Sequence, residues 1–139
     1  MLYLNYFNNN IGKDLYSDDP FIIHLNNIVS EESLMDSYAE QMKCYYFGPQ
    51  YYGKNWDALY DCLGDFSWIS QNHVVIIHSS LQEMDLSAKK IYFEIVFDTI
   101  KNQIDWIEKG NKSKVIDFVF DERDKKDIEK YMSLYKKSL

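Results

Sequence analysis

The chain has few of the residues that form cross-links or interrupt helices and strands. Its 139 residues include 2 cysteines, 2 prolines and 5 glycines. Cys44 and Cys62 show no CxxC spacing and no clustered histidines, which predicts two reduced, partly buried thiols rather than a disulfide or a metal site. No glycine-rich phosphate loop is visible either, so we expect neither a metal nor another cofactor.

Positive charge and long apolar runs are also scarce, and each shortage argues against a class of partner. A formal net charge of -7 repels phosphate backbones and anionic lipids, and Lys136 and Lys137 form only a short basic end. The longest aliphatic run, residues 74–77, is far shorter than the roughly 20 residues that cross a bilayer, and the N-terminus lacks a signal-peptide pattern. We therefore expect a soluble, cytoplasmic protein that binds neither nucleic acid nor membranes.

What is present is enough apolar and aromatic material, 46% and 17% of the residues, for one core, so we expect a single domain over residues 1–139. Apolar runs predict strands at 21–25, 73–78 and 114–120, and apolar residues at helical spacing predict helices at about 30–43, 55–66, 87–109 and 121–139. This alternation predicts an α/β fold in which helices flank a three-stranded parallel sheet. Residues 1–20 either form a hairpin, with 2–4 paired to 13–16, or cover the surface irregularly.

The second expected helix carries a row of carboxylates without neutralising partners. Asp57, Asp61 and Asp65 follow one another at i, i+4 and i+8, and no Lys or Arg lies between positions 55 and 70. Like charges at this spacing cost a helix roughly 0.2–0.5 kcal/mol per pair. A solvated face is the usual interpretation of such a row. The neighbouring rings and glycine favour a partner-binding surface instead, and they are Tyr51, Gly53, Trp56 and Tyr60.

The other side of the same helix is apolar, and Asn55 is a suitable N-cap for it. On a helical wheel the apolar residues share one broad side, and they are Trp56, Leu59, Cys62, Leu63 and Phe66. Tyr60 falls at the boundary between the two sides. The helix should therefore pack one side on the core and show its carboxylates to solvent.

Residues 51–63, YYGKNWDALYDCL, resemble the hallmark segment of the barstar family. The resemblance implies that this loop and helix enter a ribonuclease active site, where carboxylates stand in for RNA phosphates. It places Asp61 at the family's principal anchor position and Asp57 at a second interface carboxylate. The further contact positions that it implies are Tyr51, Gly53, Asn55, Tyr60 and Phe66.

Some residues depart from the family pattern. Trp56 is bulkier than the leucine of the type member, and Asp65 adds a charge where that protein has glycine; we include both in the expected partner surface. Neither Glu94 nor Asp98 of the long helix can be matched to the family's outer glutamate. The resemblance implies a barstar-like core over about 21–120, preceded by an N-terminal extension and followed by an extra C-terminal helix.

Charge and resemblance together predict a protein inhibitor, an antitoxin or immunity protein without catalytic activity. We expect a monomer that forms a 1:1 complex with a cationic ribonuclease-like toxin and blocks its active site. One alternative is an interaction module with the same fold that binds a non-ribonuclease toxin or a regulatory protein. Another is an enzyme that uses the carboxylates with His24, His73 or His78, although single histidines near strands are more often structural.

Overall fold

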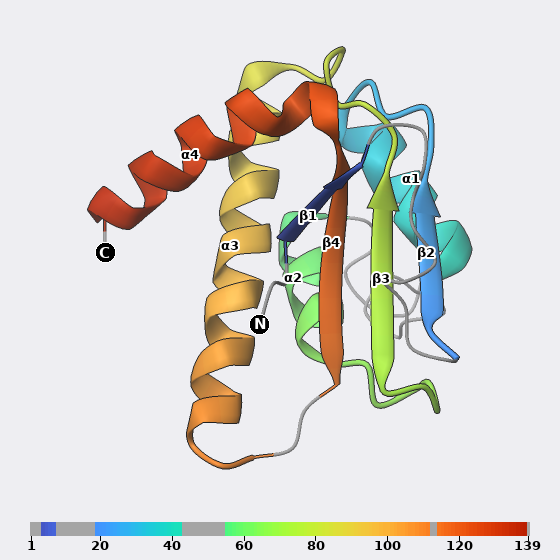
Figure 1. Ribbon diagram of the computed structural model, residues 1–139. Coiled ribbons are helices and arrows are strands. Elements are labelled where there is room, and N and C mark those ends of the chain that lie inside the picture. Colours follow the sequence, from blue (N-terminus) through green and yellow to red (C-terminus); the bar gives the residue numbers. More distant parts are fainter. Residues whose placement is uncertain (1–3, 8–18, 43–54, 112–113, 139) are drawn as a thin grey trace.

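Parallel strands and the helices that pack on them make up the fold (Figure 1). The computed structural model describes residues 4–7, 19–42, 55–111 and 114–138. The strands are β1 (Leu4–Phe7), β2 (Phe21–Leu25), β3 (His73–His78) and β4 (Val115–Asp121). The helices are α1 (Glu31–Gln41), α2 (Trp56–Gly64), α3 (Leu86–Glu108), the short 3-10 helix η3 (Glu122–Asp124) and α4 (Lys125–Ser138).

Within the described residues the sheet has the order β1-β4-β3-β2, and every pair is parallel. The three expected strands are confirmed, and they lie side by side in chain order. The crossovers from β2 to β3 and from β3 to β4 each add the next strand on the same side of the last one, so right-handed crossovers place their helices on a single face. Figure 1 shows α1 and α2 behind the sheet, with α3 beside them.

A fourth strand, β1, extends this sheet beyond the three strands that the sequence predicts. It pairs with β4, with Leu4 opposite Phe118 and Phe7 opposite Asp121. The expected hairpin is not tested, because residues 13–16 lie outside the described residues. The sequence pattern could not reveal this pairing, since a four-residue strand carries no local signal for a partner at the other end of the chain.

The core lies between the sheet and the helices. Ile76 of β3 and Phe118 of β4 are paired in register and fully buried, and they belong to one cluster with Leu59 of α2 and Phe93 of α3. Because side chains alternate across a strand, the other face of the sheet carries a separate, smaller set of buried residues. That set consists of Val75, Ile77 and Val119.

Helix α4 packs obliquely across the first half of α3 (Figure 1). Three contacts follow one another at four-residue steps on both helices: Lys89 with Asp127 (Nζ to Oδ2, 3.4 Å), Phe93 with Tyr131 (ring centroids 5.5 Å) and Phe97 with Tyr135 (5.4 Å). Matching steps keep the two helices in register over two turns. The buried side of α3 includes Phe93 and Phe97, whereas Ile91 is exposed.

The expectation of a reduced thiol is wrong for Cys62. This side chain is fully buried in α2 and is disulfide-bonded. The chain's other cysteine, Cys44, lies outside the described residues. Spacing in the sequence did not exclude a disulfide, because the bond depends on the distance between two Cα atoms in the fold and not on their separation along the chain.

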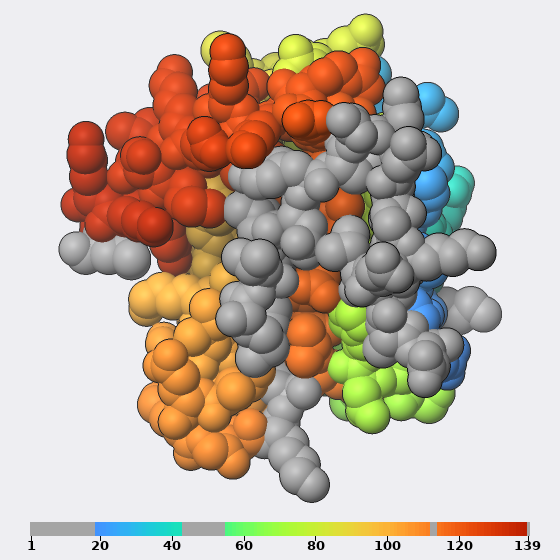
Figure 2. Space-filling view, viewed as in Figure 1, coloured from blue at the N-terminus to red at the C-terminus, as the bar shows by residue number. Residues whose placement is uncertain are grey.

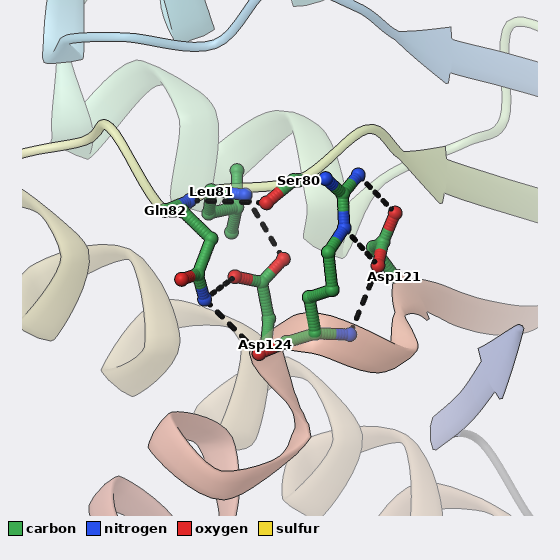
Figure 3. Close-up of polar contacts among 6 residues, drawn as sticks. Ser80, Leu81, Gln82, Asp121 and Asp124 are labelled. Carbon is green, nitrogen blue, oxygen red and sulfur yellow. Dashed lines mark hydrogen bonds and ion pairs between the residues drawn. The ribbon is translucent and has the colours of Figure 1, made fainter. Parts of the chain in front are cut away.

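A buried carboxylate joins the end of β4 to the loop that follows β3 (Figure 3). Asp124 is 1% exposed, and its two oxygens accept the Leu81 N–H at 2.9 Å and the Gln82 Nε2–H at 3.0 Å. Gln82 Nε2 also donates to the Arg123 carbonyl oxygen at 3.0 Å. These bonds offset the cost of burying a charge and hold the start of α4 against the loop that leads into α3.

Three buried polar side chains form a hydrogen-bonded chain through the core. The Tyr38 and Tyr92 hydroxyls lie 2.6 Å apart, the Tyr92 hydroxyl lies 2.5 Å from His78 Nε2, and His78 Nδ1 lies 2.9 Å from the Val119 carbonyl oxygen. Since a carbonyl only accepts, Nδ1 carries the imidazole proton. Tyr92 then donates to Nε2, and Tyr38 donates to Tyr92.

Burial disfavours the charged form of each side chain in this hydrogen-bonded chain. It lowers the pKa of His78 to about 3, because the imidazolium form would lose its hydration, and it raises the pKa of Tyr38 and Tyr92. All three side chains are therefore neutral near neutral pH, which is the state in which the bonds above are satisfied.

The free energy of unfolding should consequently depend on pH through His78. An unfolded histidine titrates near about pH 6.5. Between that value and the folded-state pKa of about 3, the unfolded chain binds a proton that the folded chain excludes. Stability is thus fully present above about pH 6.5 and is lost as the pH falls. We expect urea denaturation to show a loss of about 2 kcal/mol from this group between about pH 7 and pH 5.

The control for this prediction is His78→Gln, whose amide does not titrate. Its free energy of unfolding should be lower at neutral pH but should change less between the two pH values. Equal pH dependence in the two proteins would contradict the assignment to His78.

Candidate functional site

Helix α2 begins where the sequence predicts, because Asn55 caps it. The Asn55 Oδ1 accepts the Ala58 N–H at 2.8 Å from an extended backbone conformation. A cap of this kind contributes about 1 kcal/mol. The helix ends at Gly64, slightly before the expected Phe66, and Asp65 is its C-cap. Asn55 therefore has a structural role in addition to the predicted contact.

The two sides of α2 have the expected character. Leu59, Cys62 and Leu63 are buried, whereas Asp57 and Asp61 are exposed. Among the residues that the structure describes, none forms an ion pair with either carboxylate. The surface thus presents two negative charges, one turn apart, on a helix whose other side is fixed in the core.

Asp65, the third carboxylate of the row, has a different environment. Its Oδ1 accepts the Ser67 N–H at 3.0 Å, and its carbonyl oxygen accepts the Trp68 Nε1–H at 2.9 Å. Both bonds shape the turn after α2. Asp65 is nevertheless exposed and adds its charge to the end of the row.

Tyr60 lies at the edge of the carboxylate row, as predicted. Its ring is 39% exposed, and its hydroxyl accepts the Asn102 Nδ2–H at 2.8 Å. Asn102 belongs to α3, so this bond joins the two helices at their surface. The ring is therefore accessible to a partner and is also held in place.

Two other rings of the predicted surface are turned toward the core. Trp56 is half-buried and stacks on Tyr92, with 6.5 Å between ring centroids. Phe66 is only 5% exposed and packs against Trp68 at 5.4 Å. A resemblance can imply a contact position, but it does not determine how much of the ring is exposed. Phe66 has little exposed surface for a partner to contact.

The remaining predicted residues are distributed as follows. Tyr51 and Gly53 lie outside the described residues. Glu94 is exposed on α3. Asp98, on the same helix, accepts a hydrogen bond from the Tyr135 hydroxyl of α4. Burial and this carboxylate raise the pKa of the Tyr135 phenol, so Asp98 serves the contact between α3 and α4.

A groove of about 540 Å³ opens between the C-terminal part of α2 and α3. Tyr60 and Trp106 stand on its two helices, and the Trp106 side chain is 52% exposed. The groove is further lined by Leu63, Gly64, Asp65, Phe66, Ser67, Thr99, Asn102, Gln103, Lys114 and Ile116. The sequence did not indicate Trp106, because no feature of α3 alone places it in one groove with Tyr60.

The three histidines have three separate environments. His24 is exposed on the edge strand β2, His73 Nε2 lies 2.5 Å from Asp117 Oδ2, and His78 is buried in the core. Within the described segments, no group of three or more His, Cys, Asp or Glu side chains could hold a metal ion. Over the same segments, no helix is long and apolar enough to cross a membrane.

The fold and this surface define a class of protein, namely a parallel α/β domain that presents exposed carboxylates on a helix anchored in its core. The chain belongs to the barstar family: a family model described as "Barstar (barnase inhibitor)" matches residues 19–132. The match reaches past the expected core of 21–120 and includes the first turns of α4. No curated protein and no solved structure gives a significant match.

Proposed function

We propose that this protein inhibits a cationic ribonuclease by placing α2 in the enzyme's active site. The observation that carries the proposal is the exposed pair Asp57 and Asp61, with which no residue of the described segments forms an ion pair. A ribonuclease binds the phosphates of RNA with basic groups, and two carboxylates one helical turn apart can occupy the same groups. Membership in a family of barnase inhibitors supports this assignment.

The packing of α2 makes the carboxylates suitable for tight binding. Buried Leu59 and Leu63 fix the helix on the core, and the Asn55 cap fixes its first turn. Charges held in place before binding lose little conformational freedom when the complex forms. The mode of action is therefore a preformed acidic plug, in which the inhibitor performs no chemistry of its own.

The biological role that fits this activity is that of an antitoxin or immunity protein. In this role the protein is a cytoplasmic monomer that captures one toxin molecule, and its net charge of -7 speeds the encounter with a basic enzyme. The net negative charge of the inhibitor raises the association rate, whereas Asp61, at the centre of the contact, raises the affinity of the complex.

A second candidate is an interaction module for a cationic toxin that is not a ribonuclease. Phe66 favours it, because the ring at this position, which the resemblance to the family implies as a contact, is buried here. The two candidates differ in the enzyme that the protein blocks, so a ribonuclease inhibition assay separates them.

The test uses a barnase-type ribonuclease in two forms. The active enzyme is used to measure inhibition of RNA cleavage, and a catalytically disabled variant is used to measure binding by calorimetry. We expect a 1:1 complex, loss of RNA cleavage, and an association rate that falls at least about tenfold between roughly 0.01 M and 0.15 M salt. The double variant D57N/D61N lowers the net charge from -7 to -5 and should reduce the salt dependence of the association rate. No inhibition at any salt concentration would reject the ribonuclease assignment and leave the second candidate.

A further inference from the structure

Strand β2 is an edge of the described sheet, so its backbone pairs with another strand of this sheet on one side only (Figure 1). The Leu25 carbonyl oxygen accepts the Ser79 N–H at 2.8 Å, directly after β3, so the backbone groups of Leu25 point toward β3. Successive residues of a strand point these groups to opposite sides, so those of Ile22 and His24 point away from β3. A row of outward N–H and carbonyl groups is a template on which another chain can form a strand.

The side chain of Gln41 covers part of this edge. Gln41 is the last residue of α1, and its Oε1 accepts the His24 N–H at 2.6 Å while its Nε2–H donates to the His24 carbonyl oxygen at 2.7 Å. The same nitrogen lies 3.3 Å from the Ser37 carbonyl oxygen, which holds the amide against α1. A carboxamide carries a donor and an acceptor, as a peptide group does, so Gln41 takes the place of a residue on a neighbouring strand.

The other outward positions of the edge differ from His24. Pro20 precedes β2 and has no N–H, so strand pairing cannot continue past this end. Ile22 lies between Pro20 and His24 and is 45% exposed. Its outward N–H and carbonyl groups bond to no residue of the described segments. The edge thus has one open residue, bounded by a proline and by the residue that Gln41 covers.

The sequence of β2 can pair with itself in antiparallel register. With Ile23 opposite Ile23 of a second copy, Ile22 of each copy lies opposite His24 of the other. Each of these pairs exchanges two hydrogen bonds, so a twofold contact of this kind contains four. Both pairs require the backbone groups of His24, and Gln41 already binds these groups.

We propose that the β2 edge is a surface for pairing with a second copy of this chain, and that the Gln41 side chain keeps it closed. Without the Gln41 amide, β2 pairs with β2 of the second copy through Ile22 and His24. A net charge of -7 on each copy opposes the association, so the pairing occurs at high protein concentration. The inference is independent of the proposed function, because it concerns α1 and β2 and not the carboxylates of α2.

The first arm of the test measures amide hydrogen exchange by NMR on the whole wild-type protein. The His24 amide should exchange slowly because it is bonded to Gln41, whereas the Ile22 amide should exchange fast although it lies in the same strand. Ile23, whose N–H points toward β3, is the internal reference. In Gln41→Ala at micromolar concentration, the His24 amide should exchange at least about tenfold faster, while the Ile23 amide stays slow.

The second arm measures molecular mass by sedimentation equilibrium, from micromolar to millimolar protein. We expect the wild type to stay a monomer and Gln41→Ala to form a reversible dimer. The double variant Gln41→Ala with Ile22→Lys should return to a monomer, because lysine on an exposed edge strand prevents strand pairing. Ile22→Lys alone is the matched control and should behave as the wild type. Thermal unfolding checks that each variant folds.

Three results would overturn the inference. They are a folded Gln41→Ala variant that stays monomeric at millimolar concentration, a dimer of this variant that persists after Ile22→Lys, and a wild type that already pairs through β2. If Gln41→Ala does not fold, the exchange rates of the wild type decide the question. A His24 amide that exchanges as fast as the Ile22 amide would then show that Gln41 does not close the edge, whereas a slow His24 amide would support the proposal.

Discussion

Asp61→Ala should weaken the binding of a barnase-type ribonuclease by at least about 2 kcal/mol, or roughly thirtyfold in Kd, while the protein stays folded. Asp61 is exposed, and no ion pair within the described residues compensates it. It directly follows Tyr60 and lies one turn after Asp57 on the exposed side of α2. In the complex its charge would be desolvated against basic groups of the enzyme, which would then lose their partner in the variant.

The effect of the same substitution on the free energy of unfolding provides an independent test of this role. Removing Asp61 relieves like-charge repulsion with the carboxylates one turn away on each side, so the free energy of unfolding should rise by a few tenths of a kcal/mol. A residue whose removal lowers affinity while it raises stability is retained for binding and not for the fold.

The control is Glu32→Ala on α1, which removes the same charge from an exposed position on a helix that packs on β2. Calorimetry at moderate salt should show little change in affinity for this variant. If Asp61→Ala and Glu32→Ala bind the enzyme equally well, the anchor role of Asp61 is wrong and only net charge matters.

Tyr92→Phe should lower the free energy of unfolding by about 3 kcal/mol, measured by urea denaturation at neutral pH. The substitution removes one oxygen and hardly changes the volume of the core. It leaves two buried groups without their partner, His78 Nε2 and the Tyr38 hydroxyl, and each such group costs about 1–3 kcal/mol.

Tyr38→Phe provides the comparison, because Tyr38 stands at the end of the same hydrogen-bonded chain. Its hydroxyl donates to Tyr92, which keeps its own bond to His78 when that hydroxyl is lost. We expect this variant to lose only about 1 kcal/mol. Equal losses from the two variants would contradict the arrangement, because Tyr92→Phe removes two hydrogen bonds of the chain and Tyr38→Phe removes one.

The elements of the fold were predictable because their signals are local. Asn55 and Ser30 cap helices that begin where expected, and the strand over residues 73–78 reads directly from its apolar run. β1 and the disulfide of Cys62 were not predictable, since both depend on parts of the chain that meet only in the folded state. Local sequence patterns predict where a helix or strand forms, but they do not predict which other segment of the chain it contacts.

The residues of the candidate site also divide into those that local sequence patterns predict and those that depend on the packing of distant segments. Helical spacing alone places Asp57 and Asp61 on the exposed side of α2, and the structure agrees. Trp106 and Asn102 were not predicted, because their proximity to Tyr60 depends on how α3 packs against α2. Phe66 was predicted from resemblance as a contact, yet the turn after α2 directs its ring into the core.

The pairing of β1 with β4 has a consequence for how the protein is made. Residues 4–7 leave the ribosome well before their partners, residues 118–121. At about 5–20 residues per second, β1 waits roughly 6 to 23 seconds until β4 has been synthesised. Because β4 lies between β1 and β3, β1 can join the sheet only after β4 has formed. β1 is thus synthesised before β2, β3 and β4 but joins the sheet after them.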